Sequence, residues 1–361
     1  MAMPKSVDSA SDAGLSYVMD RGSGISRVPA RTGFHYYNAS GKRIHDPSTL
    51  RRIQSLVIPP NWKHVWICPN PNGHLQATGR DARNRKQYRY HARYRTLREQ
   101  AKYDKMILFA QNLPAIRHKV DRDLTRPGLP QQKVLATVVR LMDLSQIRVG
   151  NKEYARDNQS FGLTTMRDRH VDVEGSTIHF HFRGKSGKMH ALDLRNQRLA
   201  AIVKRCRDVP GYELFQYIDE NQAHVPVDSG MVNQYLRATT GRDITAKDFR
   251  TWHGTVHAAE QLCACGKWDT EVELKRNIVG AIKAVAEHLG NRPATCRKYY
   301  VHPLILEHYA AGKLNGLMTA KPKAGTLKGL GRTEQCVLQL LQHSPNSGVL
   351  SHRKRRSLAG S

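Results

Sequence analysis

The stretch Thr177-Ile-His-Phe-His-Phe-Arg-Gly-Lys-Ser-Gly-Lys-Met-His-Ala-Leu-Asp-Leu194 decides the class of fold. Apolar and polar residues alternate from Thr177 to Phe182 and again from Met189 to Leu194, which is the period of a half-buried strand. Gly184-Lys-Ser-Gly187 separates the two runs and supplies the glycines that a tight turn needs. We therefore predict a β-hairpin with a basic tip.

The chain around this hairpin has helical periodicity instead. Leu135, Val138 and Met142 recur at the spacing of one helix face, and Thr270 with Glu273 forms a capping box at the start of another helix. The apolar face of that second helix comprises Ile278, Ile282, Val285 and Leu289. We predict that residues 93–312 form a mainly α-helical domain that contains the hairpin.

The preceding residues predict a β-rich domain over residues 26–92. Three runs, Gly33–Tyr37, His64–Cys68 and His74–Thr78, have the composition of strands, and Asp46-Pro47 predicts the start of a helix between the first two. The fold class is thus α+β. Residues 1–25 are Ser, Asp and Gly rich and predict a flexible leader.

The end of the chain, residues 313–361, predicts a basic, mobile tail. It is rich in Lys, Gly and Pro, has a short amphipathic stretch over Cys336–Leu341, and ends with the basic run Arg353-Lys-Arg-Arg356. A polybasic segment of this kind attracts DNA without regard to its sequence.

Charge predicts the partner. The 361 residues contain 58 Lys and Arg against 30 Asp and Glu, a formal net charge of +28, which predicts a nucleic acid as the partner. The six cysteines have neither a paired disulfide rhythm nor the CxxC spacing of a zinc site, as is typical of reduced thiols. No run of residues is apolar and long enough for a membrane span, so we expect a protein of the cytoplasm. We also expect it to be a monomer.

A basic segment interleaved with tyrosines is the strongest candidate for DNA contact. Arginine and lysine neutralise phosphates, while Gln and Tyr side chains bond phosphates or base edges. A merely solvated charged face would alternate in sign, whereas this segment is opposed only by Asp81. The predicted DNA-binding residues are Arg80, Arg83, Arg85, Lys86, Gln87, Tyr88, Arg89 and Tyr90.

Four further stretches have the residue types that a tyrosine needs to cleave a phosphodiester. Such a reaction requires a nucleophile, donors for the charge of a pentacoordinate transition state, and a proton for the departing oxygen. The stretches are Ile147-Arg-Val-Gly150, Phe182-Arg-Gly-Lys185, Lys247-Asp-Phe-Arg250, and Gly290-Asn-Arg-Pro293 with Tyr300 nine residues after Asn291.

The order Arg, Lys, Arg, Asn, Tyr with these neighbours is similar to that of the type IB topoisomerase and tyrosine recombinase superfamily. The stretches from Ile58-Pro-Pro60 to Lys86-Gln-Tyr-Arg-Tyr90 resemble the N-terminal domain of the bacterial and poxvirus-type topoisomerases in particular. The resemblance covers roughly residues 14–312. It implies a two-lobed clamp around double-stranded DNA that relaxes positive and negative supercoils.

The resemblance also implies a role for each residue of the four stretches. Tyr300 would be the nucleophile, Arg148, Arg250 and Asn291 would contact the nonbridging oxygens of the scissile phosphate, and Lys185 would be the general acid. Poxvirus members have His where this chain has Asn291. No metal or ATP is required, because the phosphotyrosine conserves the free energy of the broken bond.

Several alternatives stay open at this point. Tyr299 adjoins Tyr300, and Lys188 is close enough to Lys185 to compete as the acid. A tyrosine recombinase would typically have His in place of Lys247, and a noncatalytic architectural DNA-binding protein would have the charge without the tyrosine site. His253 and His257 are four residues apart, but no acidic third ligand adjoins them, so we predict no metal site.

Overall fold

The computed structural model of the chain describes residues 10–320 and 327–343 and divides the molecule into two compact units, Met1–Tyr103 and Asp104–Ser361. Helix α3 (Ala92–Leu124) begins in the first unit and ends in the second. The division therefore falls within a helix, about ten residues after the boundary expected near residue 92.

The first unit contains a five-stranded antiparallel sheet with strand order β2-β1-β3-β4-β5. The strands are β1 (Ile25–Pro29), β2 (Phe34–Tyr37), β3 (Lys63–Ile67), β4 (Leu75–Arg80) and β5 (Lys86–Tyr90). Helix α2 (Pro47–Ser55) starts as predicted, because the Asp46 carboxylate accepts a hydrogen bond from the Thr49 amide at 2.8 Å. Ile53 of this helix packs into the core of the sheet.

The predicted flexible leader needs correction where the structure describes it. Ala10 and Leu15 are buried in a small cluster with Tyr94 of α3. The amide of His74 donates a hydrogen bond to the Ser16 carbonyl at 2.8 Å. Two isolated apolar residues thus anchor a polar segment that has no periodicity of its own, and the packed unit begins by residue 10.

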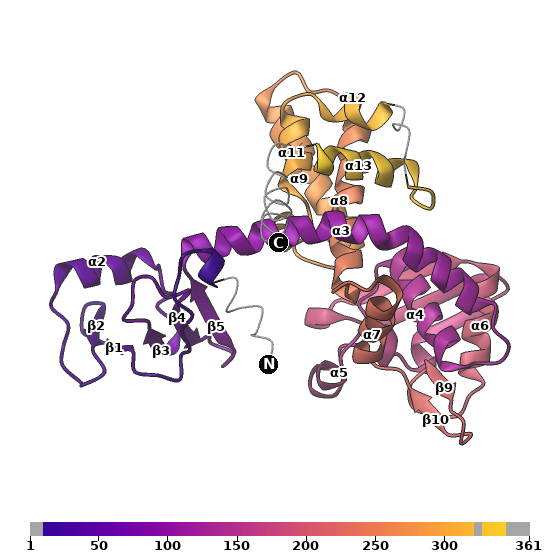
Figure 1. Ribbon diagram of the computed structural model, residues 1–361, viewed down its shortest axis with the longest axis horizontal. Coiled ribbons are helices and arrows are strands. Elements are labelled where there is room, and N and C mark those ends of the chain that lie inside the picture. Colours follow the sequence, from indigo (N-terminus) through magenta and orange to yellow (C-terminus); the bar gives the residue numbers. More distant parts are fainter. Residues whose placement is uncertain (1–9, 321–326, 344–361) are drawn as a thin grey trace, which may run out of the picture. The chain divides into compact units, whose positions relative to one another are not determined.

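The second unit is built around the long helix α8 (Ala246–Cys265), which contains the fully buried Trp252. Four helices that contact it are α4 (Gln131–Ser145), α7 (Ser229–Thr240), α9 (Glu271–His288) and α11 (Pro303–Ala310) (Figure 1). The remaining helices described before residue 313 are α5 (Lys152–Asn158), α6 (Gln197–Arg207) and α10 (Pro293–Tyr299).

The predicted hairpin is confirmed, and a third strand extends it. Strands β7 (Thr177–Arg183) and β8 (Met189–Arg195) pair in antiparallel register, and β6 (Val171–Glu174) adds to the free edge of β7. Helix α6 packs against β6 and β7. A second, smaller sheet of β9 (Gln216–Ile218) and β10 (His224–Pro226) was not predicted.

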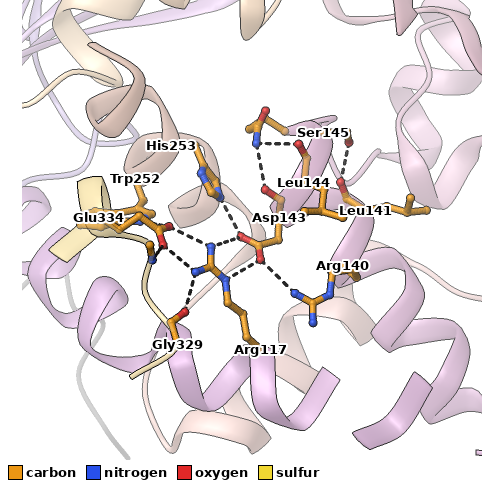
Figure 2. Close-up of polar contacts among 12 residues, drawn as sticks. Arg117, Arg140, Leu141, Asp143, Leu144, Ser145, Trp252, His253, Gly329 and Glu334 are labelled. Atoms are coloured by element: carbon orange, nitrogen blue, oxygen red, sulfur yellow. Dashed lines mark hydrogen bonds and ion pairs between the residues drawn. The ribbon is translucent and has the colours of Figure 1, made fainter. Parts of the chain in front are cut away.

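The predicted mobile tail also needs correction over its described part. Helices α12 (Leu314–Thr319) and α13 (Arg332–Gln342) both contact α8. Figure 2 shows why α13 is held: the Glu334 carboxylate accepts hydrogen bonds from both terminal nitrogens of Arg117, at 2.7 and 2.9 Å. Arg117 also bonds Asp143 of α4, so helix α13 belongs to the packed core. The basic run at 353–356 lies outside the described residues.

Candidate active site

Arg250 joins two loops, one that contains Arg148 and one that contains Asn291. Its Nη1 donates to the carbonyl of Gln146, just after α4, and its Nη2 donates to the carbonyl of Leu289, just after α9, at 2.5 Å. The side chain is only 6 % exposed, and its position on α8 sets its direction. Arg250 therefore holds together the loops that contain Arg148 and Asn291.

Arg148 and Asn291, which are 143 residues apart in the sequence, meet across this junction. The Arg148 Nη2 donates a hydrogen bond to the Asn291 Oδ1 at 2.6 Å. The amide nitrogen Nδ2 of Asn291 is buried and has no hydrogen-bond partner. The oxygen of the amide is thus satisfied within the protein, while its donor remains available to an acceptor that enters the site.

The two arginines form a site that is suited to an anion. They line a cavity of about 20 Å³ whose described lining also includes His190 and His288 but no carboxylate. Burial lowers the pKa of Arg148, and burial together with the charge of Arg148 lowers the pKa of Arg250 to about 10. Two desolvated like charges repel each other, so binding of a phosphate here would relieve an unfavourable interaction.

Tyr300 lies at the end of α10 and faces Arg250, with the Cζ atom of Arg250 5.6 Å from the centre of the tyrosine ring. Helix α8 holds the Tyr300 backbone: the Thr255 hydroxyl donates to the Tyr300 carbonyl at 3.1 Å. A methyl group on Gly254 would lie 2.9 Å from the same carbonyl oxygen, so the close approach requires glycine. Tyr299 instead is 49 % exposed.

The hairpin tip contains Lys185 and Lys188, both exposed. The structure places the Lys185 Nζ 5.8 Å from the ring centre of Tyr154 in α5, rather than against the arginine pair. Burial is the main cause that lowers the pKa of His190, and the charge of Lys188 adds to it; burial raises the pKa of Cys296, and the same charge partly opposes that rise. Four of the five predicted catalytic residues, Arg148, Arg250, Asn291 and Tyr300, therefore converge, while Lys185 lies on the adjoining tip.

Sequence reasoning missed His190, which lines the cavity beside both arginines. The ring stacks on Phe182 with 5.0 Å between centres, and its Nε2 is buried without a hydrogen-bond partner. A lone histidine in a strand gives no signal by itself. The signal appears only in the folded chain: a side chain added at Gly184 or at Gly290 would overlap this ring, and each of these glycines immediately precedes a predicted catalytic residue.

The two histidines weighed as metal ligands have other partners. His253 bonds the buried carboxylate of Asp143 at 2.9 Å, and His257 lies 3.6 Å from Glu260, with its ring 4.9 Å from that of His288 and tilted by 32°. Within the described ranges, no group of three or more His, Cys, Asp or Glu residues could hold a metal ion.

The predicted DNA-binding segment forms the last residue of β4, the edge strand β5 and the turn between them. Lys86, Tyr88 and Tyr90 alternate on the exposed face, where the two tyrosine rings stack 5.9 Å apart. The half-buried alternate residues bond the protein itself: the Gln87 amide donates to Asp81, and Arg89 donates to the Val57 carbonyl at 2.8 Å. Strand geometry thus separates the predicted DNA-binding residues onto two faces.

Comparison with known proteins decides the family. Residues 91–324 match the family described as eukaryotic DNA topoisomerase I, catalytic core, a range that contains all five predicted catalytic residues. The chain belongs to the type IB DNA topoisomerase family. Residues 33–81 match the bacterial DNA topoisomerase IB N-terminal domain, which identifies the first unit as the matching part of such an enzyme.

Individual type IB topoisomerases are similar over most of the chain. A DNA topoisomerase 1B of Acanthamoeba polyphaga mimivirus is 31 % identical over 293 residues, covering 79 % of this chain and 87 % of that protein. A DNA topoisomerase 1B of Vaccinia virus (strain Copenhagen) is 21 % identical over 234 residues, covering 63 % and 70 %. The protein is accordingly a type IB DNA topoisomerase, an isomerase whose substrate is DNA. No described helix is both long and apolar enough to span a membrane.

Proposed function

We propose that Tyr300 cleaves one strand of double-stranded DNA and holds the 3′ phosphate until the strand is resealed. The tyrosine hydroxyl loses its proton to solvent, its oxygen forms a bond to phosphorus, and the bond from phosphorus to the 5′ oxygen breaks. Attack by the 5′ hydroxyl reverses these changes and restores the strand. The observation that carries the proposal is one connected set of groups: Arg148 bonds Asn291, Arg148 and Arg250 line the same cavity, and Arg250 lies over the Tyr300 ring.

Each neighbouring group has a task in this reaction. The two guanidinium groups and the unpartnered Asn291 Nδ2 donate to the nonbridging oxygens, where charge accumulates in the transition state. Lys185 gives its proton to the departing 5′ oxygen and takes it back during resealing. Since the phosphotyrosine conserves the energy of the broken bond, the cycle needs no ATP, and the arginines, Asn291 and Lys185 supply the charge stabilisation and the proton for which other enzymes use a metal ion.

The proposed reaction also requires a surface that contacts DNA. We propose that the duplex is bound by Arg80, Arg83 and Arg85 at the β4–β5 turn and by Lys86, Tyr88 and Tyr90 on the exposed face of β5, while the half-buried Gln87 and Arg89 hold the strand in place, and that the two units act as a clamp. The cut strand would then rotate about the intact one and relax supercoils of either sign. We further propose that the protein acts as a monomer on the nucleoid in the bacterial cytoplasm, because its N-terminal part matches the bacterial subgroup.

Plasmid relaxation tests the proposal directly. The protein should relax positively and negatively supercoiled plasmid in EDTA without ATP. Tyr300→Phe should abolish relaxation and covalent DNA adducts while leaving DNA binding unchanged, because only the attacking oxygen is removed. Tyr299→Phe is the matched control and should keep both activities. An absolute need for a divalent metal, or adducts that vanish with Tyr299→Phe instead, would refute the assignment.

A further inference from the structure

His190 is wedged between two glycines, each next to a residue of the proposed site. A methyl group built on Gly184 would lie 2.5 Å from the ring Cδ2 and 2.6 Å from the Nε2, and one built on Gly290 would lie 2.2 Å from the ring Cε1. Gly184 directly precedes Lys185, and Gly290 directly precedes Asn291. The ring therefore fills the junction between the hairpin tip and the phosphate-binding turn.

The ring cannot leave this junction easily. In the hairpin register His190 pairs with Phe182, and the two rings stack nearly parallel, 8° apart. Phe182 is itself buried at 3 % exposure. Phe182 covers one face of the His190 ring, and the ring edge with Nε2 packs against Gly184 and Gly290. The hairpin tip can therefore move relative to the turn before Asn291 only if this packing is lost.

The tip transmits this constraint to its lysines. The Gly184 amide donates to the Lys188 carbonyl at 2.7 Å, and the Gly187 amide donates to the Gly184 carbonyl at 3.1 Å. These bonds close a tight turn around Lys185. A displacement of Gly184 therefore displaces the backbone of the residue proposed to protonate the leaving oxygen.

Charge on His190 is not what the ring supplies to the site. Burial, and then the positive charges of Arg148, Arg250 and Lys188, lower the pKa of the ring to about 4. The imidazole is thus neutral near pH 7, so its influence on the site does not come from a positive charge, and the contacts with Gly184 and Gly290 are the geometric observation that remains.

We propose that His190 is a positioning residue whose ring holds the hairpin tip that contains Lys185 against the turn that contains Asn291. The inference rests on the proposed function, because it concerns the delivery of the proton in that reaction. It predicts that removal of the ring impairs the proton-transfer step specifically. Weaker phosphate binding would instead indicate that the ring supports the arginine pair.

A substrate with sulfur in place of the bridging 5′ oxygen separates these possibilities, since a thiolate leaves without a proton. His190→Ala should slow single-turnover cleavage of ordinary DNA by about 10²-fold, at the low end of the range for general acid catalysis. On the sulfur substrate its rate should recover toward wild type, as should that of Lys185→Ala. Arg148→Ala should remain slow on both. His181→Ala, an exposed histidine of the same hairpin, is the matched control and should cleave both substrates normally.

Gly184→Ala provides a second route that keeps the histidine. The backbone there has φ of −94°, which alanine adopts without strain, so the added methyl acts through its overlap with the ring. Gly184→Ala should reproduce the sulfur-rescued defect. Adding it to His190→Ala should cause little further impairment, because the overlap is then gone. Independent, multiplying defects would contradict the proposed role of the ring.

The outcomes also distinguish the inference from the proposed function. If sulfur rescues Lys185→Ala but neither His190→Ala nor Gly184→Ala, the inference fails and the general acid stands. If Lys188→Ala and His190→Ala are rescued while Lys185→Ala is not, the acid is Lys188 and His190 still positions the tip. If no hairpin variant is rescued, the proton-transfer role of the hairpin fails, and the positioning role of His190 fails with it.

Discussion

Arg148 donates a hydrogen bond to the side-chain oxygen of Asn291, and this bond fixes which way the asparagine amide faces. The oxygen is occupied, so the buried Nδ2 is the atom that remains to meet a phosphate. A neutral amide at this position therefore supplies a directed donor without adding a third positive charge to the site.

Asn291→Asp should be more damaging than Asn291→His. The aspartate would keep a bond to Arg148 but would place a negative charge where the phosphate must bind. We expect cleavage to slow by about 10²–10³, the typical cost of removing a donor to a developing oxyanion. Histidine, which poxvirus members have here, retains a donor and should impair cleavage less. Single-turnover cleavage of labelled DNA measures the rate of each variant. Rates equal to that of the wild type in both variants would show that the Nδ2 atom has no role.

The identity of the general acid is decided between two lysines on one turn. Lys185→Ala should slow cleavage of ordinary DNA by about 10²–10⁴. Lys188→Ala should slow it much less, although the charge of Lys188 reaches His190 and Cys296. Rates on oxygen and sulfur substrates compare the two variants. A larger oxygen-specific defect in Lys188→Ala would transfer the role to that residue.

The two faces of strand β5 should respond differently to substitution. Lys86→Ala and Tyr88→Ala, on the exposed face, should weaken DNA binding; Tyr88→Ala should change the unfolding temperature little, whereas Lys86→Ala also removes the 2.6 Å ion pair with Asp20. Removing one ionic interaction with a phosphate should reduce the salt slope of log K by roughly 0.9. Arg89→Ala should destabilise the fold instead, because Arg89 bonds the Val57 carbonyl and lies over Trp62. Fluorescence anisotropy with the Tyr300→Phe protein, alongside thermal unfolding, separates the effects; weaker binding confined to Arg89→Ala would reverse the assignment of faces.

Glu334 should stabilise the protein at neutral pH but not in acid. Burial alone would raise its pKa, but the hydrogen bonds and charge of Arg117 outweigh burial and lower the pKa below the usual value. The contribution is therefore present at pH 7 and is lost as the pH falls below about 4.3, the ordinary value for glutamate.

Urea unfolding at pH 7 and at pH 3.5 tests this pH dependence. Glu334→Gln should reduce stability by roughly 1.5–3 kcal/mol at pH 7, the contribution of a hydrogen bond to a charged group, and by less at pH 3.5. Glu287→Gln, at an exposed position of α9, is the control and should change nothing. A Glu334→Gln defect that stays constant with pH would mean that shape rather than charge holds α13.

Periodicity predicted those elements whose own residues show it. The β7–β8 hairpin, α2 with its Asp46 cap, and the apolar face of α4 are all present. Strand β5 was seen only as a basic segment, because an edge strand with charged and aromatic residues lacks the apolar alternation of a buried one. Ala10 and Leu15 were missed because two single apolar contacts with distant residues leave no local pattern.

The candidate site, like the fold, could be predicted from the sequence only in part. The motif order pointed to Arg148, Arg250, Asn291 and Tyr300, and the structure brings these residues together. His190 could not be predicted, since its role depends on two glycines far apart in the sequence that meet only in the folded chain. The exposed side chain of Lys185 is likewise a matter of rotamer and turn geometry that sequence order does not determine.

The match to the catalytic-core family ends before the last described helix that packs in the second unit. The match to the catalytic core ends at residue 324, before α13, yet Glu334 in α13 bonds Arg117 and the indole nitrogen of the buried Trp252, two residues from Arg250 (Figure 2). A fragment trimmed to the matched region would retain every predicted catalytic residue and still lack a buried countercharge. Anyone shortening this protein for crystallography or engineering should therefore cut after residue 343, beyond the last described helix, rather than where the resemblance stops.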